Sequence, residues 1–337
     1  MVRRPITSST RVLTIVGMAI ALLVGPSAAF AAPVNNSTNT LKISPVRRDA
    51  EVKPGESKTF QTTVTNLTNT DITVRAIEND FIAGDEQGTP ALILDETKYA
   101  PSHSLKRYMK PIANITVPAN GAKTVSVVVT MPKDVKAGGY FGAIRFAPVS
   151  LETGGQVNLN ASVASLLLVT VPGKVTEKLN LTNFEVQQNG KTGEMFGTPD
   201  KLQLLARFVN DGGIQEAPFG KVSVIQDDKK VVYEADFNNK DPRDVVLPDS
   251  ARRWDIPLKN IGSFGHYTVT ATFTYGKNNQ SIEISKSFWV IPQMVIIAAV
   301  VGLLVLIALI VGIWMFLKNY KRRLLKKHGG SGLGIRH

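Results

Sequence analysis

The sequence predicts an all-β exported part made of two tandem Ig-like β-sandwiches, followed by a single transmembrane α-helix. Three observations predict this architecture. Short alternating apolar and polar runs, separated by Pro, Gly, Asn and Asp, recur about every ten residues over 41–292. Residues 294–317 contain no charge, and their length exceeds the roughly 20 apolar helical residues that cross a bilayer core. The N-terminus has the pattern of an export signal.

That N-terminal signal has three parts. A start with three arginines precedes the apolar core 12–24, and residues 29–31 (Ala-Phe-Ala) fit a small-residue cleavage pattern. We expect residues 1–31 to be a signal peptide cleaved after Ala31, with an uncleaved N-terminal anchor as the alternative. Residues 32–40 are polar and lack apolar periodicity, which predicts a linker.

Residues 41–172 are expected to form the first β-sandwich. Apolar alternation predicts strands at 41–44, 58–66, 72–78, 122–131, 140–148 and 158–171. The stretch 80–111 interrupts this rhythm with several glycines and prolines and a possible short helix at 104–109. Such a loop is long for a sandwich connection, and long ordered loops often carry binding residues.

Residues 173–292 are expected to form the second sandwich. Its predicted strands are 175–187, 201–210, 220–225, 230–236, 252–257, 267–275 and 281–290. Pro292 ends this block almost directly before the apolar run. The second sandwich is therefore expected to stand close to the membrane.

The apolar run 294–317 is predicted to be an anchor. It contains no ionisable residue, and ion paths or proton relays need such groups. Residues 318–337 are basic and carry no acid, so the tail is expected to be cytoplasmic and the preceding domains extracellular. Trp289 and Trp314 lie near the two ends of the run, where indole rings prefer the headgroup boundary.

The charge and the cysteine count narrow the class of protein. The formal net charge is +12, of which the signal region carries three and the tail seven, leaving +2 on the exported part. The basic character therefore reflects topology, and no nucleic-acid partner is expected. An exported chain of this size without cysteine suits a bacterial envelope protein better than a disulfide-stapled ectodomain.

Several motifs, taken in their order along the chain, give the two blocks a family resemblance. They are 52–60 (VKPGESKTF), 63–66 (TVTN), 131–139 (MPKDVKAGG), 141–146 (FGAIRF), 206–210 (ARFVN), 218–220 (PFG), 247–250 (LPDS), 265–269 (GHYTV) and 288–292 (FWVIP). On these motifs the chain resembles the cell-surface WxL-interacting proteins of Gram-positive bacteria. The segment 43–50 lacks the aromatic pair of that family, which indicates a distant member.

The resemblance implies a non-catalytic scaffold at the cell membrane. The first sandwich would bind peptidoglycan or another wall polymer, and the second would bind surface or host proteins. The lipid bilayer is the third expected partner, through the helix. An alternative of a different class is an exported structural subunit of a membrane assembly such as a pilus or secretion apparatus.

No catalytic residue, metal site or cofactor is predicted. His103 is the residue on which a hydrolase alternative would depend, but a solvated loop histidine is expected. Asp80, Asp85 and Glu86 lack the spacing of a calcium loop. In Arg252-Arg253-Trp254 we expect Trp254 in the core and both arginines in solvent.

The predicted binding residues are cationic or aromatic. Lys106, Arg107 and Tyr108 lie on the long loop, and Arg145 lies opposite the apolar face of its strand. Guanidinium groups and planar rings suit glycan and protein surfaces. A solvated loop and a structural strand arginine are the alternative interpretation for these four residues.

Overall fold

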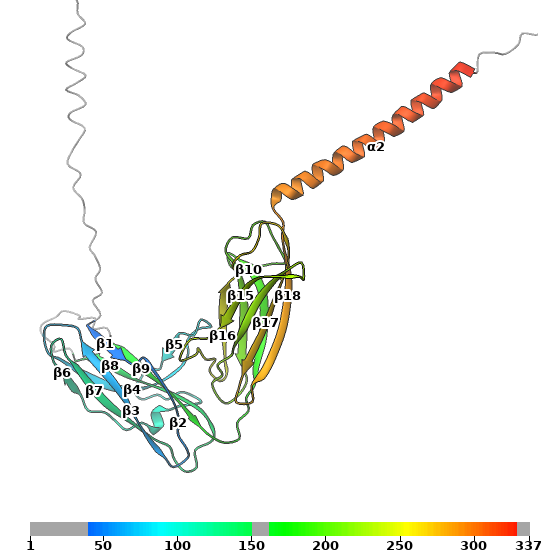
Figure 1. The fold of residues 1–337 in the computed structure, drawn as a ribbon. Helices are drawn as coiled ribbons and strands as arrows, with labels where there is room; N and C mark the ends of the chain where they lie inside the picture. Colours follow the sequence, from blue (N-terminus) through cyan, green and yellow to red (C-terminus); the bar gives the residue numbers. More distant parts are fainter. Residues whose placement is uncertain (1–39, 150–161, 329–337) are drawn as a thin grey trace, which may run out of the picture. The chain divides into compact units, whose positions relative to one another are not determined.

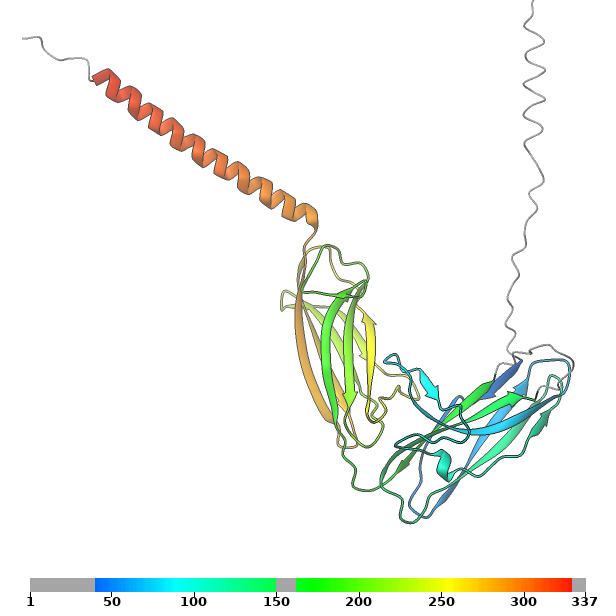
Figure 2. The ribbon, with the colours of Figure 1, turned by 180° about the vertical axis from the view of Figure 1, so that it is seen from behind.

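The computed structural model describes residues 40–149 and 162–328. The predicted signal peptide, nearly all of the predicted linker and the last nine residues lie outside this range. Before residue 291 the regular elements of the described part are β-strands and one short 3-10 helix, and the described part ends in one long helix (Figures 1 and 2). The all-β class followed by a candidate membrane helix is thus confirmed.

The first sandwich has a small sheet and a larger one. The small sheet has the order β1-β3-β7, and the larger has the order β2-β9-β8-β4-β5, with β6 also paired to β4. The strands are β1 (Leu41–Ser44), β2 (Arg47–Glu51), β3 (Ser57–Asn66), β4 (Ile72–Ala83), β5 (Pro90–Leu92), β6 (Ile115–Val117), β7 (Ala122–Thr130), β8 (Gly138–Pro148) and β9 (Val163–Val171). All pairs are antiparallel except β2 with β9.

The second sandwich also has two sheets, ordered β11-β10-β13-β16 and β12-β18-β17-β14-β15. The strands are β10 (Leu179–Gln188), β11 (Lys191–Thr192), β12 (Met195–Phe196), β13 (Leu202–Asn210), β14 (Phe219–Gln226), β15 (Lys230–Phe237), β16 (Ser250–Pro257), β17 (Gly265–Tyr275) and β18 (Gln280–Val290). The predicted strands of both sandwiches begin and end within five residues of the observed bounds. The start of the predicted strand 158–171 lies outside the described residues, and the short strands β2, β5, β6, β11 and β12 were not predicted.

Alternation along the strands places one face of each sheet in a core. In the second sandwich four aromatic rings form one cluster, namely those of Phe208, Phe237, Phe273 and Trp254. The ring centroids of its T-shaped pairs are 4.9–5.6 Å apart. This edge-to-face geometry is the favoured one for buried aromatic pairs. Trp254 therefore belongs to the core, as predicted.

Strand β9 is apolar on both faces, and the structure gives the reason. Leu167 and Val169 face the main core of the first sandwich. Leu166 and Leu168 face the other way, into a smaller cluster with Phe81 and Phe141. The apolar run in the sequence is continuous because both faces of β9 are buried, each in a different hydrophobic cluster.

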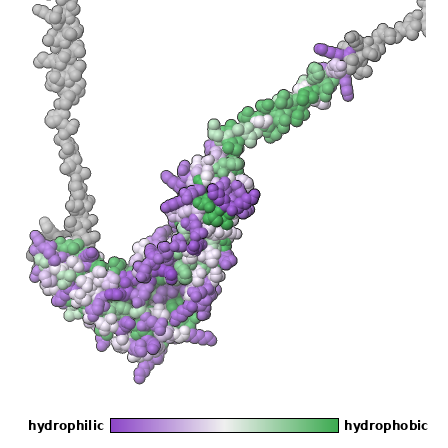
Figure 3. Space-filling view, viewed as in Figure 1, coloured by the Kyte–Doolittle hydropathy of each residue, from purple (hydrophilic) through white to green (hydrophobic). Residues whose placement is uncertain are grey.

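The helix α2 (Gln293–His328) contains the predicted anchor. Within it, Gln293–Arg323 is long and apolar enough to cross a membrane. Figure 3 shows its surface as hydrophobic until the basic end, and its large apolar side chains are exposed. A long helix that is apolar on every side is typical of a membrane span.

Candidate binding surface

A buried carboxylate organises the long insertion of the first sandwich. Asp80 lies near the end of β4 and is fully buried. Its oxygens accept hydrogen bonds from the Ala100 amide at 2.9 Å, the Ser104 hydroxyl at 2.6 Å and the Lys106 amide at 2.8 Å. A buried carboxylate is stable only with such donors. Asp80 therefore fixes the path of the chain through the insertion.

Arg145 supports the same insertion from the neighbouring strand. On β8, its Nε donates to Asn79 Oδ1 at 3.2 Å, and Asn79 Nδ2 donates to the Ile93 carbonyl at 2.8 Å. Asn79 is fully buried, and Arg145 is half-buried. The contacts of Arg145 described here favour the structural interpretation over direct contact with a ligand.

Lys106 and Arg107 gather around an exposed tyrosine. They begin the 3-10 helix η1 (Lys106–Tyr108), which is shorter than the predicted helix at 104–109. Arg107 Cζ lies 4.2 Å and Lys106 Nζ 5.1 Å from the centroid of the Tyr99 ring. Tyr99 is 45% exposed. We call Tyr99, Lys106 and Arg107 the Tyr99 platform.

The backbone holds this platform in place. Lys106 Nζ donates to the Glu96 carbonyl at 2.6 Å and to the Lys98 carbonyl at 3.1 Å. The lysine thus closes the turn that presents Tyr99. Cations near a ring face are attracted by the ring quadrupole, so the platform is largely preformed.

Tyr108 points the other way and acts as a support. Its ring meets the Tyr140 ring edge-on at 5.6 Å, and it packs against the core of the first sandwich. The Tyr140 hydroxyl donates to the Lys136 carbonyl at 2.8 Å. Burial, and then the neighbouring Tyr108, raise the pKa of Tyr140. Of the four predicted residues, the structure thus brings Lys106 and Arg107 together with Tyr99, whereas Tyr108 and Arg145 have other partners.

The other polar residues of the insertion have separate partners. Asp85 Oδ1 accepts from the Gln87 and Thr89 amides, both at 2.9 Å, which closes the tight turn after β4. Glu86 forms a bidentate pair with Arg207, whose hydrogen bond lowers the pKa of the carboxyl. Asp80, Asp85 and Glu86 therefore accept hydrogen bonds from three different sets of donors.

His103 is held by its backbone surroundings. Its Nδ1 donates to the Gly139 carbonyl at 2.6 Å, and its ring packs 5.8 Å from Phe141. The other ring nitrogen lies 4.0 Å from an Asp249 carboxylate oxygen. These contacts give His103 a structural role.

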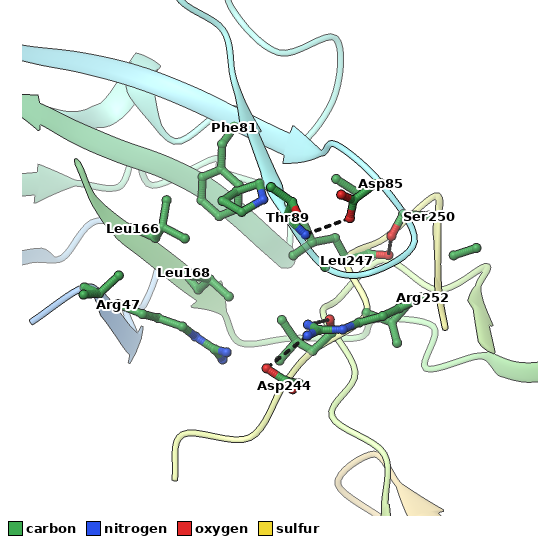
Figure 4. Close-up of a pocket in the computed structure, with 17 residues that line it drawn as sticks. Arg47, Phe81, Asp85, Thr89, Leu166, Leu168, Asp244, Leu247, Ser250 and Arg252 are labelled. Atoms are coloured by element: carbon green, nitrogen blue, oxygen red, sulfur yellow. Dashed lines mark hydrogen bonds and ion pairs between the residues drawn. The ribbon is translucent and has the colours of Figure 1, made fainter. Parts of the chain in front are cut away.

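A cavity of about 220 Å³ lies beside the turn after β4 (Figure 4). Phe81, Leu166 and Leu168 form its apolar wall, and Arg252 closes it. The guanidinium of Arg252 pairs with Asp244 at 3.1 Å and donates to the Val245 carbonyl at 2.9 Å. The expectation that Arg252 is solvated was wrong, because its side chain is only 14% exposed.

Glycine is required at the rim of this cavity. A Cβ added to Gly88 would lie 2.3 Å from Arg252 Cζ, and its φ of +90° also disfavours other residues. The backbone of the turn at Gly88 therefore packs directly against the guanidinium of Arg252. The polar groups that line the cavity largely bond one another, so the Tyr99 platform is the better candidate for binding.

Tyr99 was not among the predicted binding residues. Its signal in the sequence is an aromatic residue within a polar stretch, Lys98-Tyr99-Ala100, on the insertion. Its association with Arg107 depends on the turn that Asp80 and Lys106 close. That turn could not be read from local sequence.

Comparison with known proteins gives one match to a family model. Residues 49–148 match the model described as WxL Interacting Protein, peptidoglycan binding domain. The matched segment contains Asp80, the whole insertion and the Tyr99 platform. The sequence has no match among curated proteins.

Similar solved structures include three chaperone structures. They are a chaperone-tip adhesin complex of CFA/I fimbriae (13% identity, 73% of this chain and 98% of that chain covered, TM-score 0.38), the class 5 fimbriae chaperone CfaA (12%, 74% and 98%, TM-score 0.37) and the E. coli chaperone DraB (14%, 74% and 98%, TM-score 0.31). These TM-scores are too low to support an inference about function.

Proposed function

Residues 49–148 belong to the peptidoglycan-binding domain family of WxL-interacting proteins, and on this premise we propose that the chain is a membrane-anchored scaffold that holds cell-wall polymer near the membrane. The matched family is a binding domain. The proposed action is accordingly adhesion without catalysis.

The observation that carries the proposal is the family match over the segment that presents the Tyr99 platform. An exposed ring offers a flat apolar face to sugar C–H groups, and a guanidinium binds carboxylates in a planar, bidentate manner. Wall glycan and its peptide stems carry both kinds of group. We assign Tyr99, Lys106 and Arg107 to direct contact, with Tyr108 and Arg145 as supports.

The membrane topology is part of the same proposal. Residues 1–31 would direct export, residues 41–172 and 173–292 would be the wall-binding and partner-binding domains, and residues 318–337 would stay in the cytoplasm. The basic run after the helix supports this orientation. The second domain would bind surface or host proteins.

Co-sedimentation with purified cell-wall sacculi tests the wall contact. The full chain in detergent micelles is mixed with sacculi, and the bound fraction is measured for wild type, Tyr99→Ala and Arg107→Ala. We expect each variant to bind about tenfold more weakly, equivalent to about 1.4 kcal/mol. Arg243→Ala is the matched control, because Arg243 stacks on Phe219 at 3.9 Å in the second sandwich.

Two results would contradict the proposal at different levels. Wild-type protein that stays in the supernatant would overturn wall binding itself. Wild-type sedimentation that is unchanged in Tyr99→Ala and Arg107→Ala would retain wall binding and remove the Tyr99 platform from it.

A further inference from the structure

The junction between the second sandwich and α2 is short and ordered. The Trp289 amide donates to the Glu194 carbonyl at 2.7 Å, and the Ile291 amide donates to the Phe196 carbonyl at 2.8 Å. On the other side, the Val295 amide already donates to the Pro292 carbonyl at 2.9 Å. One residue step spans at most about 3.6 Å. The end of the sandwich where β18 finishes must therefore lie within a few ångströms of the start of the helix.

Strand register identifies the other segments at this end of the sandwich. Gly265 pairs with Val290, Gln226 pairs with Tyr267, and Gln226 pairs with Lys230. The turn 227–229 and the loop 258–264 consequently lie at the end where β18 meets the helix. We call this end of the second sandwich the helix-proximal end.

Exposed apolar side chains are concentrated at the helix-proximal end. Among the described residues from Leu179 to Val290, the exposed large hydrophobic side chains are Met195 (62%), Phe264 (56%), Val231 (55%) and Trp289 (43%). Met195 pairs with Trp289 in register, Val231 pairs with Ile225 next to Gln226, and Phe264 directly precedes Gly265. All four therefore lie at one end of the sandwich.

Single exposed hydrophobic residues are common on soluble domains, but they are not expected to gather at one end. The charges beside them are mixed, since Asp227 and Asp228 adjoin Lys229 and Lys230, and Glu194 pairs with Lys286 at 2.5 Å. Such a surface suits the headgroup layer, where aromatic rings are favoured, more than it suits a strongly charged partner.

We propose that the helix-proximal end lies in the headgroup layer of the membrane that α2 enters, with Trp289, Phe264 and Met195 in contact with lipid. The partner is the lipid surface, reached through the continuity of β18 with the helix. This inference rests on the membrane span in the proposed function and not on wall binding, so the two can fail separately. Its consequence is that the helix-proximal end of the second sandwich stays in contact with the bilayer.

Site-directed spin labelling tests this contact, because the chain contains no cysteine. Phe264→Cys, Met195→Cys and Lys277→Cys are labelled with a nitroxide in the full chain, reconstituted in nanodiscs of zwitterionic lipid. Lys277 lies in the turn between β17 and β18, at the opposite end of both strands, and is the control. The measurement compares collision of the label with oxygen, which concentrates in lipid, and with a water-soluble nickel chelate.

We expect the oxygen-to-nickel ratio at 264 and 195 to be several-fold higher than at 277, and unchanged between low salt and about 1 M NaCl, at which the Debye length is about 3 Å. Equal ratios at 264 and 277 would overturn the proposal. So would a high ratio that disappears in salt, because the contact would then be electrostatic. All three labelled positions are exposed, so substitution there should not disturb the fold. A circular dichroism spectrum like that of the wild type is the check.

Discussion

Asn66 ends β3 in the first sandwich, and Asn210 ends β13 in the second. Both side chains are fully buried, and both accept a hydrogen bond from the amide two residues on and donate to the carbonyl four residues on. Asn66 also donates to the carbonyls of Val117 and Pro118, and Asn210 to that of Val246. The two sandwiches thus close equivalent turns with the same residue type.

The sandwiches differ in what they add to this common plan. The first extends β4 into an insertion fixed by a buried carboxylate and presents an exposed ring with two cations. The second has no comparable insertion within its described residues and places its exposed apolar side chains beside the helix. The difference indicates that the contact surface of the first sandwich is its insertion, whereas that of the second is its helix-proximal end.

The largest expected effect comes from disrupting the insertion of the first sandwich. Asp80→Ala removes the acceptor of three hydrogen bonds, and hydrogen bonds to charged groups contribute about 1.5–3 kcal/mol each. We expect the insertion to lose order at a cost of at least about 3 kcal/mol. Hydrogen exchange of the Ala100 and Lys106 amides should become much faster. Asp95→Ala, which changes an exposed acid on the same insertion, should leave both amides protected.

A buried carboxyl in the second sandwich gives the next effect. Glu216 is 3% exposed. Burial, and then the charge of Glu177, raise the pKa of Glu216 to about 7. Its ordinary value is 4.5, so between these pH values the folded protein holds a proton that the unfolded chain has released. Stability therefore falls as the pH rises through this window.

Glu216→Gln removes this pH dependence. The variant should exceed the wild type in unfolding free energy by about 3 kcal/mol at about pH 8 and equal it at about pH 4. Calorimetry at both pH values measures the difference. A variant that is less stable than the wild type at the higher pH would show that Glu216 is charged in the fold and has a bound partner.

The two asparagines provide a direct test of their equivalence. Asn66→Ala and Asn210→Ala each leave buried carbonyls without a donor, at an expected cost of about 2 kcal/mol. Each variant should speed amide exchange in its own sandwich and leave the other unchanged. If one of the two substitutions changed neither stability nor amide exchange, the two asparagines would share their hydrogen-bond geometry but not their contribution to stability.

The smallest effect concerns the pair between Glu86 and Arg207. The two groups are 42% and 30% exposed, so solvent weakens their attraction and we expect Glu86→Gln to cost less than about 1 kcal/mol. The pair lowers the pKa of Glu86, so its contribution is present above about pH 4.5 and is lost as the pH falls. Exchange of the Arg253 amide, which donates to the Glu86 carbonyl at 2.6 Å, is the measurement.

Much of the fold could be predicted from local patterns. Strands with clear alternation, such as β1 and β18, were predicted nearly to the residue, and the apolar helix was evident from its length. The short strands β5 and β12 were missed because two or three residues carry no periodicity. Strand β4 was predicted to end at Glu78 but continues to Ala83, since Asp80 is stabilised by donors some 20 residues further on.

The candidate site was predicted only in part, for the same reason. Lys106 and Arg107 could be selected by residue type, but their common partner Tyr99 depends on a turn closed by long-range hydrogen bonds. Arg252 was predicted to lie in solvent, and Arg145 was predicted to be either a binding residue or a structural strand arginine. In the structure both arginines donate to part-buried acceptors, and which acceptors they reach depends on the packing of the strands.

The eleven-residue register between β17 and β18 has a mechanical consequence. Tension between a wall contact and the helix would pull β18 along its own length, because Ile291 and Pro292 leave no slack. Sliding β18 past β17 requires many ladder hydrogen bonds to break together, whereas peeling would break them one by one. The pairing of β18 with β17 should therefore resist a high pulling force, and unfolding of the chain under tension should begin elsewhere.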